Sequence, residues 1–141
     1  MTTVLVPVDG SPSATRAVEW LARTLRGRAD ARVHLLHVQA AVDAWEARSH
    51  LGADDVARFE AAAHQSVLEP AATTLRAAGV AVETHGASGE VAPQVHALVR
   101  QLDCDSVVMG TRGLGTVQAL LLGSTAMQVL HLVDVPVTLI K

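Results

Sequence analysis

The sequence predicts an α/β protein built on a doubly wound parallel sheet with helices on both faces. Short apolar runs rich in β-branched residues alternate with longer segments in which apolar residues recur at helical spacing. The segments between successive runs are long enough to carry a crossover helix, which parallel strands require. Because such crossovers are right-handed, the helices are expected to cover both faces of the sheet.

Five of these runs are expected to form the strands. The first is continuous and apolar, as in a strand buried on both faces, and it ends at Asp9 and Gly10. The last contains Pro136, which lacks an amide donor and therefore favours the edge of the sheet. The expected strands are 3–8, 33–38, 80–84, 106–109 and 135–140.

Helices are expected between these strands. Ser11 followed by Pro12 is typical of a helix start, because the hydroxyl caps the first turn and proline fits it. Pro70 removes one amide donor inside the second helix and is expected to kink or break it. The expected helices are 12–26, 55–78, 90–102 and 124–132, with an irregular loop over 39–54 and a turn over 86–89.

Length and composition indicate one compact domain over residues 1–141. The formal charge of −3 and a total of two tryptophans and one phenylalanine argue against a nucleic-acid partner. No apolar stretch approaches the ~18 residues that a membrane-spanning helix needs, and the first apolar run lacks the basic leader of a signal peptide. The single cysteine, Cys104, has no CxxC neighbour. We therefore expect a cytoplasmic protein without membrane contact.

A glycine-marked segment follows the expected fourth strand. It contains Gly110 and Gly113, and it ends with Gly123 and Ser124 at the start of a helix. Glycines let backbone amides approach an anion without a Cβ in the way, and the free amides and dipole at a helix start favour negative charge. An isolated glycine trio more often only shapes turns. The position of these glycines between a strand and a helix favours a phosphate site.

This spacing of glycine, two residues, glycine, nine residues, glycine and serine resembles the nucleotide-binding signature of the ATP-binding universal stress proteins. Residues 4–11, 105–115, 122–130 and 135–137 also resemble the family, so the resemblance extends over the whole chain. It implies a five-stranded sheet in the order 3-2-1-4-5, with the Rossmann-like, adenine nucleotide alpha hydrolase-like fold. It further implies ATP in a cleft between the first and fourth strands, and a homodimer paired through the last strand, from Val135 to Ile140.

The resemblance also assigns individual residues to the nucleotide. Asp9 matches a position that contacts the nucleoside, and Val38 matches the backbone partner of adenine. Arg112 is left open between a phosphate contact and a solvent-facing charge. The implied binding residues are Pro7, Val8, Asp9, Val38, Met109, Gly110, Arg112, Gly113, Gly123, Ser124 and Thr125.

The carboxylate of Asp9 would repel a polyphosphate. It is therefore expected to face the ribose or to hold Mg²⁺. The alternative is a local role in capping near Ser11. Because Asp9 ends the first strand, at the expected reversal of strand order, the ligand role is favoured.

A nucleotide-dependent stress-response or signalling module is the favoured function, and no catalytic residue is predicted. A slow Mg-dependent ATPase ranks lower, because no residue is evidently placed to orient the attacking water. An AMP-binding protein and a nucleotide-free dimeric scaffold are left open.

The seven histidines predict no metal site. His34 and His37 are three residues apart on an expected strand, so their side chains point to opposite faces and do not chelate jointly. The other five are scattered along the sequence, so each is expected to be solvated or satisfied by hydrogen bonds. His37 and His85 are expected near the rim of the cleft.

Overall fold

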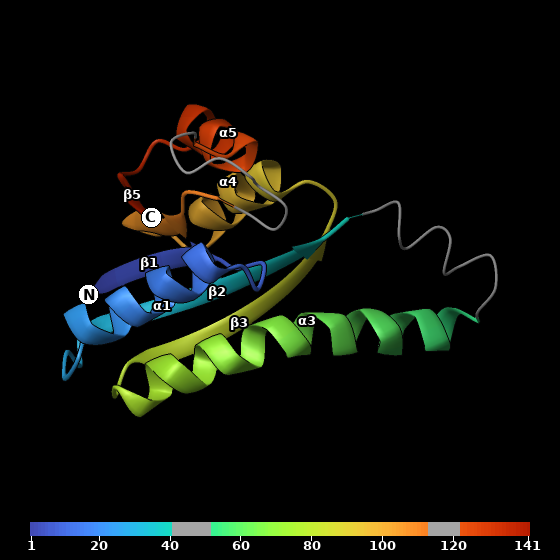
Figure 1. The fold of residues 1–141 in the computed structure, drawn as a ribbon, viewed down its shortest axis with the longest axis horizontal. Coiled ribbons are helices and arrows are strands. Elements are labelled where there is room, and N and C mark those ends of the chain that lie inside the picture. Colours follow the sequence, from blue (N-terminus) through green and yellow to red (C-terminus); the bar gives the residue numbers. More distant parts are fainter. Residues whose placement is uncertain (41–51, 113–121) are drawn as a thin grey trace.

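The computed structural model describes residues 1–40, 52–112 and 122–141, and these residues form a five-stranded sheet in the order β3-β2-β1-β4-β5. All four pairs of neighbouring strands are parallel. Figure 1 shows the strands side by side with helices above and below them. The predicted fold class, the strand order and the covering of both faces are confirmed.

Strands and helices alternate along the part of the chain that the structure describes. The strands are β1 (Thr2–Pro7), β2 (Ala31–Gln39), β3 (Ala81–Ser88), β4 (Ser106–Gly110) and β5 (Val137–Ile140). The helices are α1 (Pro12–Thr24), α3 (Ala53–Ala77), α4 (Val91–Gln101) and α5 (Ser124–Leu132). The expected loop over 39–54 and the glycine-marked connection lie largely outside the described residues.

Each face of the sheet has its own hydrophobic core. Side chains alternate along β1, so Val4 and Val6 pack under α1 and α3, while Leu5 packs under α4 and α5. Leu5 and Leu75 are both fully buried, one in each core. Burial of a leucine side chain contributes about 1.5–3 kcal/mol. The two cores together fix the sheet whose carboxyl edge carries the candidate site.

Helix α1 begins as its sequence predicts. The Ser11 hydroxyl accepts a hydrogen bond from the Ala14 amide at 3.3 Å, and Pro12 occupies the first turn. Such a cap typically contributes about 1 kcal/mol. The cap therefore fixes the direction in which α1 leaves the end of β1.

Helix α3 is continuous through Pro70, so the expectation of a break is wrong. Its sheet-facing side carries Leu68, Ala72 and Leu75, which are buried, whereas Pro70 is exposed. Packing of this apolar side holds the helix together across the missing hydrogen bond. The Thr74 hydroxyl donates to the carbonyl oxygen of Pro70 at 3.1 Å.

The third strand is longer than predicted and includes Gly86, which was expected in a turn. A Cβ on Gly86 would lie 2.7 Å from the Cδ2 atom of His64, so only glycine allows the α3 side chain to pack directly on the strand. The last strand is shorter than predicted and starts after Pro136. The carbonyl oxygen of Pro136 accepts from the Val107 amide at 2.9 Å, and β5 is an edge strand as expected.

Within the described ranges, no helix combines the length and apolar character that crossing a membrane requires.

Candidate functional site

A cavity of about 190 Å³ opens beyond the carboxyl ends of β1 and β4. These two strands are neighbours in the sheet, but the helices that follow them pack on opposite faces, α1 on one and α5 on the other. The chain therefore diverges here to both sides of the sheet. In open parallel sheets this reversal of strand order is where ligands bind.

The structure brings together the residues that the sequence analysis assigned to a nucleotide. Ten of the eleven line this cavity, and the eleventh, Gly113, lies outside the described residues. The ten are Pro7, Val8, Asp9, Val38, Met109, Gly110, Arg112, Gly123, Ser124 and Thr125.

Six further residues line the same cavity and were missed. Ser11 and Ala14 belong to the start of α1, and their place follows once α1 is known to leave the end of β1. The contribution of Val91 depends on how α4 packs over the sheet, which no local sequence signal encodes. The six are Ser11, Ala14, Leu36, Val91, Thr111 and Ala126.

Gly110 ends β4 at a point where the chain touches the first turn of α1. A Cβ on Gly110 would lie 2.8 Å from the Ala14 amide nitrogen, closer than real Cβ contacts come. The close approach places the start of α1 against the chain that leaves β4. Glycine is required at this position by backbone contact, independently of any ligand.

Hydrogen bonds fix the backbone of Arg112 to α1. The Ser13 hydroxyl donates to the carbonyl oxygen of Arg112 and accepts from the Arg112 amide at 3.4 Å. The Ser11 hydroxyl donates to the same carbonyl oxygen at 3.3 Å. Arg112 is thus held at the cavity wall through its backbone.

The two ends of the segment between β4 and α5 are joined directly. The Gly123 amide donates to the carbonyl oxygen of Thr111 at 2.7 Å. Because Gly123 also precedes the first turn of α5, this hydrogen bond sets the start of the helix beside the end of β4. The distance between the first and last glycine of the signature is therefore fixed by backbone contacts.

Three helix starts contribute residues to the cavity wall. Helix α1 contributes Ser11 and Ala14, α4 contributes Val91, and α5 contributes Ser124 and Thr125. The residue before α5 is Gly123, which has no side chain, and no other side chain among the described residues caps this helix. Free amides and the positive ends of the helix dipoles therefore meet at one edge of the sheet, which favours an anion.

Asp9 has the local role that was considered as an alternative, and it also lines the cavity. Its Oδ1 atom accepts from the Ser11 amide at 2.9 Å. This hydrogen bond fixes the carboxylate at the end of β1 rather than letting it turn to solvent. A fixed carboxylate suits a hydroxyl donor or a cation.

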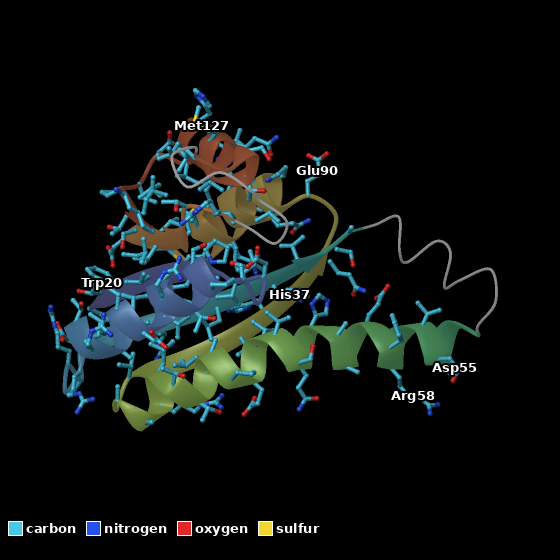
Figure 2. The ribbon with its side chains drawn as sticks, in the orientation of Figure 1. Trp20, His37, Asp55, Arg58, Glu90 and Met127 are labelled. Carbon is cyan, nitrogen blue, oxygen red and sulfur yellow. The ribbon has the colours of Figure 1, made fainter. Side chains whose placement is uncertain are left out.

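Four histidines form two pairs on opposite faces of the sheet, as the spacing of His34 and His37 predicted. His34 Nδ1 lies 3.0 Å from His85 Nε2, and His37 Nδ1 lies 2.7 Å from His64 Nδ1. Figure 2 shows His37 between the sheet and α3. Neither His37 nor His85 lines the cavity.

Strand register and helix packing thus bring together histidines that are far apart in the sequence. Burial lowers the pKa of His34 and that of His37 below the ordinary value. Glu83 opposes the shift in the pKa of His34, and Asp9 opposes that of His37. Both imidazoles are thereby favoured in the neutral form.

Comparison with known proteins decides the family. A family model described as the universal stress protein family matches residues 1–141. The chain belongs to the universal stress protein family. A universal stress protein of Mycolicibacterium smegmatis is 32% identical over 97% of this chain, which spans 47% of that relative. Universal stress protein G of Escherichia coli O157:H7 is 30% identical over 99% of this chain and 98% of its own length.

Solved structures share the fold. The hypothetical protein MJ0577 superposes with a TM-score of 0.85 at 21% identity, covering 99% of this chain and 95% of its own. A universal stress protein family member of Arabidopsis thaliana with AMP bound gives 0.73 at 23% identity, covering 100% and 92%. The universal stress protein of Archaeoglobus fulgidus in complex with dAMP gives 0.67 at 24% identity, covering 100% and 98%.

Proposed function

We propose that this universal stress protein binds an adenine nucleotide, ATP in the first place, in the cavity between β1 and β4. The single observation that carries the proposal is that ten residues assigned by the family resemblance meet three helix starts around one cavity. The complexes of its fold neighbours with AMP and dAMP support an adenine ligand.

The residues of the cavity wall suggest how the nucleotide binds. Val8, Val38 and Met109 are apolar, and the proposal assigns the base to them because its faces would be buried there. Asp9 is assigned to the ribose hydroxyls or to Mg²⁺ beside the phosphates. The polar group for the phosphates consists of Gly110, Arg112, Gly123, Ser124 and Thr125, with Gly113 beyond the described residues.

The cavity of about 190 Å³ is smaller than the 300 Å³ or so from which drug-sized pockets start, as measured in other proteins. The described walls therefore hold one end of the ligand, and the proposal assigns the nucleoside to them. The number of phosphates decides how far the ligand extends past Gly123. AMP and ATP should accordingly share the base contacts and differ at the helix starts.

Calorimetric titration tests this proposal. ATP and AMP, each with and without Mg²⁺, are titrated into the purified chain and into Ser124→Ala. We expect saturable micromolar binding of ATP, weakened modestly in Ser124→Ala because one hydroxyl donor is lost. Stronger binding of AMP would make the protein an AMP-binding module. No binding of either nucleotide at millimolar concentration would leave a nucleotide-free scaffold.

A slow Mg-dependent ATPase is the second candidate, favoured by the carboxylate of Asp9 in the cavity. Phosphate release over hours, measured for the wild type and Asp9→Asn, separates the two functions. Binding without release supports a stress-response or signalling role in which occupancy is read by a partner. Release that Asp9→Asn abolishes would support hydrolysis.

The proposal includes a cytoplasmic location for the protein. It also includes a homodimer that forms through the edge strand β5. Val137 and Leu139 are half-buried on this strand, whose outer edge pairs with no other strand among the described residues. A two-fold axis beside β5 would cover both edges at once. Sedimentation of the wild type and Val137→Lys tests it, and a wild-type monomer at micromolar concentration would contradict it.

A further inference from the structure

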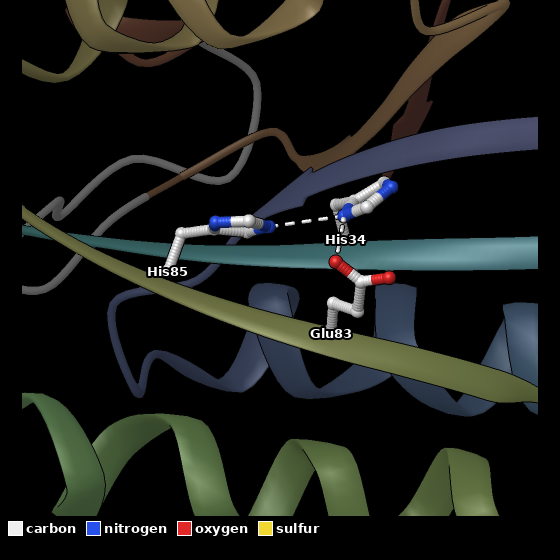
Figure 3. Close-up of side chains that lie close together, drawn as sticks. All are labelled: His34, Glu83 and His85. Atoms are coloured by element: carbon white, nitrogen blue, oxygen red, sulfur yellow. Dashed lines mark hydrogen bonds and ion pairs between the residues drawn. The ribbon is translucent and has the colours of Figure 1, made fainter. Parts of the chain in front are cut away.

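Two histidines and a glutamate lie together on the face of the sheet opposite α3. Figure 3 shows His34 on β2 with Glu83 and His85 on β3. The distance from His34 Nδ1 is 3.0 Å to His85 Nε2 and 3.7 Å to Glu83 Oε2. One ligand atom from each residue lies within 4.8 Å of the other two.

The backbone brings the three side chains together. His34 is the register partner of Glu83 in the parallel pair β2–β3, and His85 follows Glu83 by two residues on the same strand face. Helix α3 packs on the other face of these strands, where Val33, Leu35 and Val82 meet it. The cluster is therefore held by a hydrogen-bonded ladder rather than by a loop.

The spacing suits tetrahedral coordination. Zinc binds imidazole nitrogen and carboxylate oxygen at about 2.0–2.2 Å, which separates neighbouring ligand atoms by about 3.3 Å. The two distances from His34 Nδ1, 3.0 Å and 3.7 Å, lie on either side of this value. Small side-chain rotations suffice to reach the coordination geometry.

The surroundings divide the cluster into a buried and an open side. The His34 side chain is only 5% exposed, whereas Glu83 is 50% exposed. Burial favours the neutral imidazole, the form that ligates a metal. The exposed side gives an ion a path from solvent and leaves room for water as a further ligand.

Arg32 orients the carboxylate. Its Nη1 atom lies 3.0 Å from Glu83 Oε1, and the other oxygen, Oε2, is the one nearer His34. Partners of this kind fix the direction of a ligating carboxylate. None of the three cluster residues lines the cavity at the carboxyl edge, so the cluster is separate from the proposed nucleotide site.

We propose that His34, Glu83 and His85 bind a zinc ion, with water completing the coordination. Two imidazoles and one carboxylate with an open position form a ligand set that zinc sites in proteins use. The competing explanation is a metal-free cluster in which one imidazole donates to the other and Glu83 pairs with Arg32. The two explanations differ in what the protein does when zinc is added.

The test is calorimetric titration of zinc chloride into the chelator-treated full chain. We expect one zinc ion per chain, and at least ~10-fold weaker binding in His85→Gln and in Glu83→Gln. These two positions are half-buried and exposed, so the variants keep the core, and a thermal melt by circular dichroism verifies folding. Tetrahedral cobalt absorption, lost in the same variants, is the second readout.

Two matched variants serve as controls. His131→Gln removes an exposed histidine on α5, and His64→Gln removes a member of the other histidine pair. Both should bind zinc as the wild type does, and ATP titration of all four variants should be unchanged. Absence of zinc uptake by the wild type, or unchanged uptake in His85→Gln, would overturn the proposal in favour of the metal-free cluster.

Discussion

The side-chain hydroxyl of Ser13, in the first turn of α1, hydrogen-bonds both backbone groups of Arg112, which lies 99 residues later in the chain. Ser13 is buried, with 2% of its surface exposed. One side chain thus satisfies a carbonyl and an amide where the chain leaves β4. The contact joins the first turn of α1 to the chain that leaves β4, beside the cavity.

Removing this hydroxyl should loosen the cavity. In Ser13→Ala the carbonyl and amide of Arg112 lose a buried partner, and we expect a loss of about 1–3 kcal/mol in the free energy of unfolding. Denaturant unfolding measures the loss. Nucleotide affinity should fall as well, because Arg112 would no longer be held at the wall.

Ser66→Ala is the matched control for that variant. The Ser66 hydroxyl donates to the carbonyl oxygen of Ala63 at 2.8 Å on an exposed turn of α3. Its removal should change the free energy of unfolding by no more than about 0.5 kcal/mol. Equal effects of the two substitutions would argue against a special role for Ser13.

A side chain at Gly110 should disturb both packing and binding. The Cβ of Gly110→Ala would press on the Ala14 amide nitrogen at 2.8 Å, and overpacking of this kind costs about 1–3 kcal/mol. Thermal melting and ATP titration of the variant should both show the change. Gly52→Ala is the control, because its Cβ would meet Asp55 Oδ2 at an ordinary 3.8 Å. A melting temperature for Gly110→Ala equal to that of wild type would contradict the packing argument.

Much of the fold could be predicted from the sequence, because its apolar residues form clear strand-like runs and recur clearly at helical spacing. Strands buried on both faces, such as β1, read as continuous apolar runs, and the cap at Ser11 marks the start of α1. The residues of the cavity wall were predicted from the resemblance to the universal stress proteins. Two of them, Asp9 and Gly110, lie at strand ends, and parallel strands end at one edge of the sheet.

The features that the sequence did not predict depend on contacts between distant parts of the chain. Pro70 does not interrupt α3, because its exposed position spares the apolar side that packs on the sheet. Gly86 continues β3, since the ring of His64 packs directly on it. The pairing of His34 with His85 depends on the register between β2 and β3, which no local pattern encodes.

The pair of His37 and His64 should make stability depend on pH. Burial lowers the pKa of His37, the neighbouring His64 lowers it further, and Asp9 opposes both. The unfolded chain therefore takes up this proton at a higher pH than the folded chain. The contribution of neutral His37 to the free energy of unfolding is fully present above the unfolded pKa of about 6.5. It is lost as the pH falls below that value toward the lower pKa of the folded state.

Unfolding of His37→Gln across this pH range measures the contribution. The free energy of unfolding should fall less steeply below neutral pH in the variant than in the wild type. His131→Gln, on the exposed side of α5, should keep the wild-type slope. A slope unchanged in His37→Gln would show that the pair does not contribute to it.

Cys104 should be inert in the folded protein. Burial, together with the smaller effect of the charges of Asp105 and Asp103, raises the pKa of its thiol to about 11. Because the thiolate is the reactive form, alkylation by iodoacetamide near pH 8 should proceed only after denaturation. Mass spectrometry of the treated native protein checks this, and rapid modification would contradict the buried placement.

The central claim concerns one cavity and one class of ligand, so it is tested most directly by observing backbone amides while ATP and Mg²⁺ are added. In ¹H–¹⁵N correlation spectra we expect shifts at Asp9, Gly110, Gly123 and Ser124, which line the cavity. The amide signals of residues at the opposite, amino edge of the sheet should not shift. Asp30, directly before β2, is one of them. Unchanged spectra at millimolar ATP, or shifts confined to residues outside the cavity, would contradict the account.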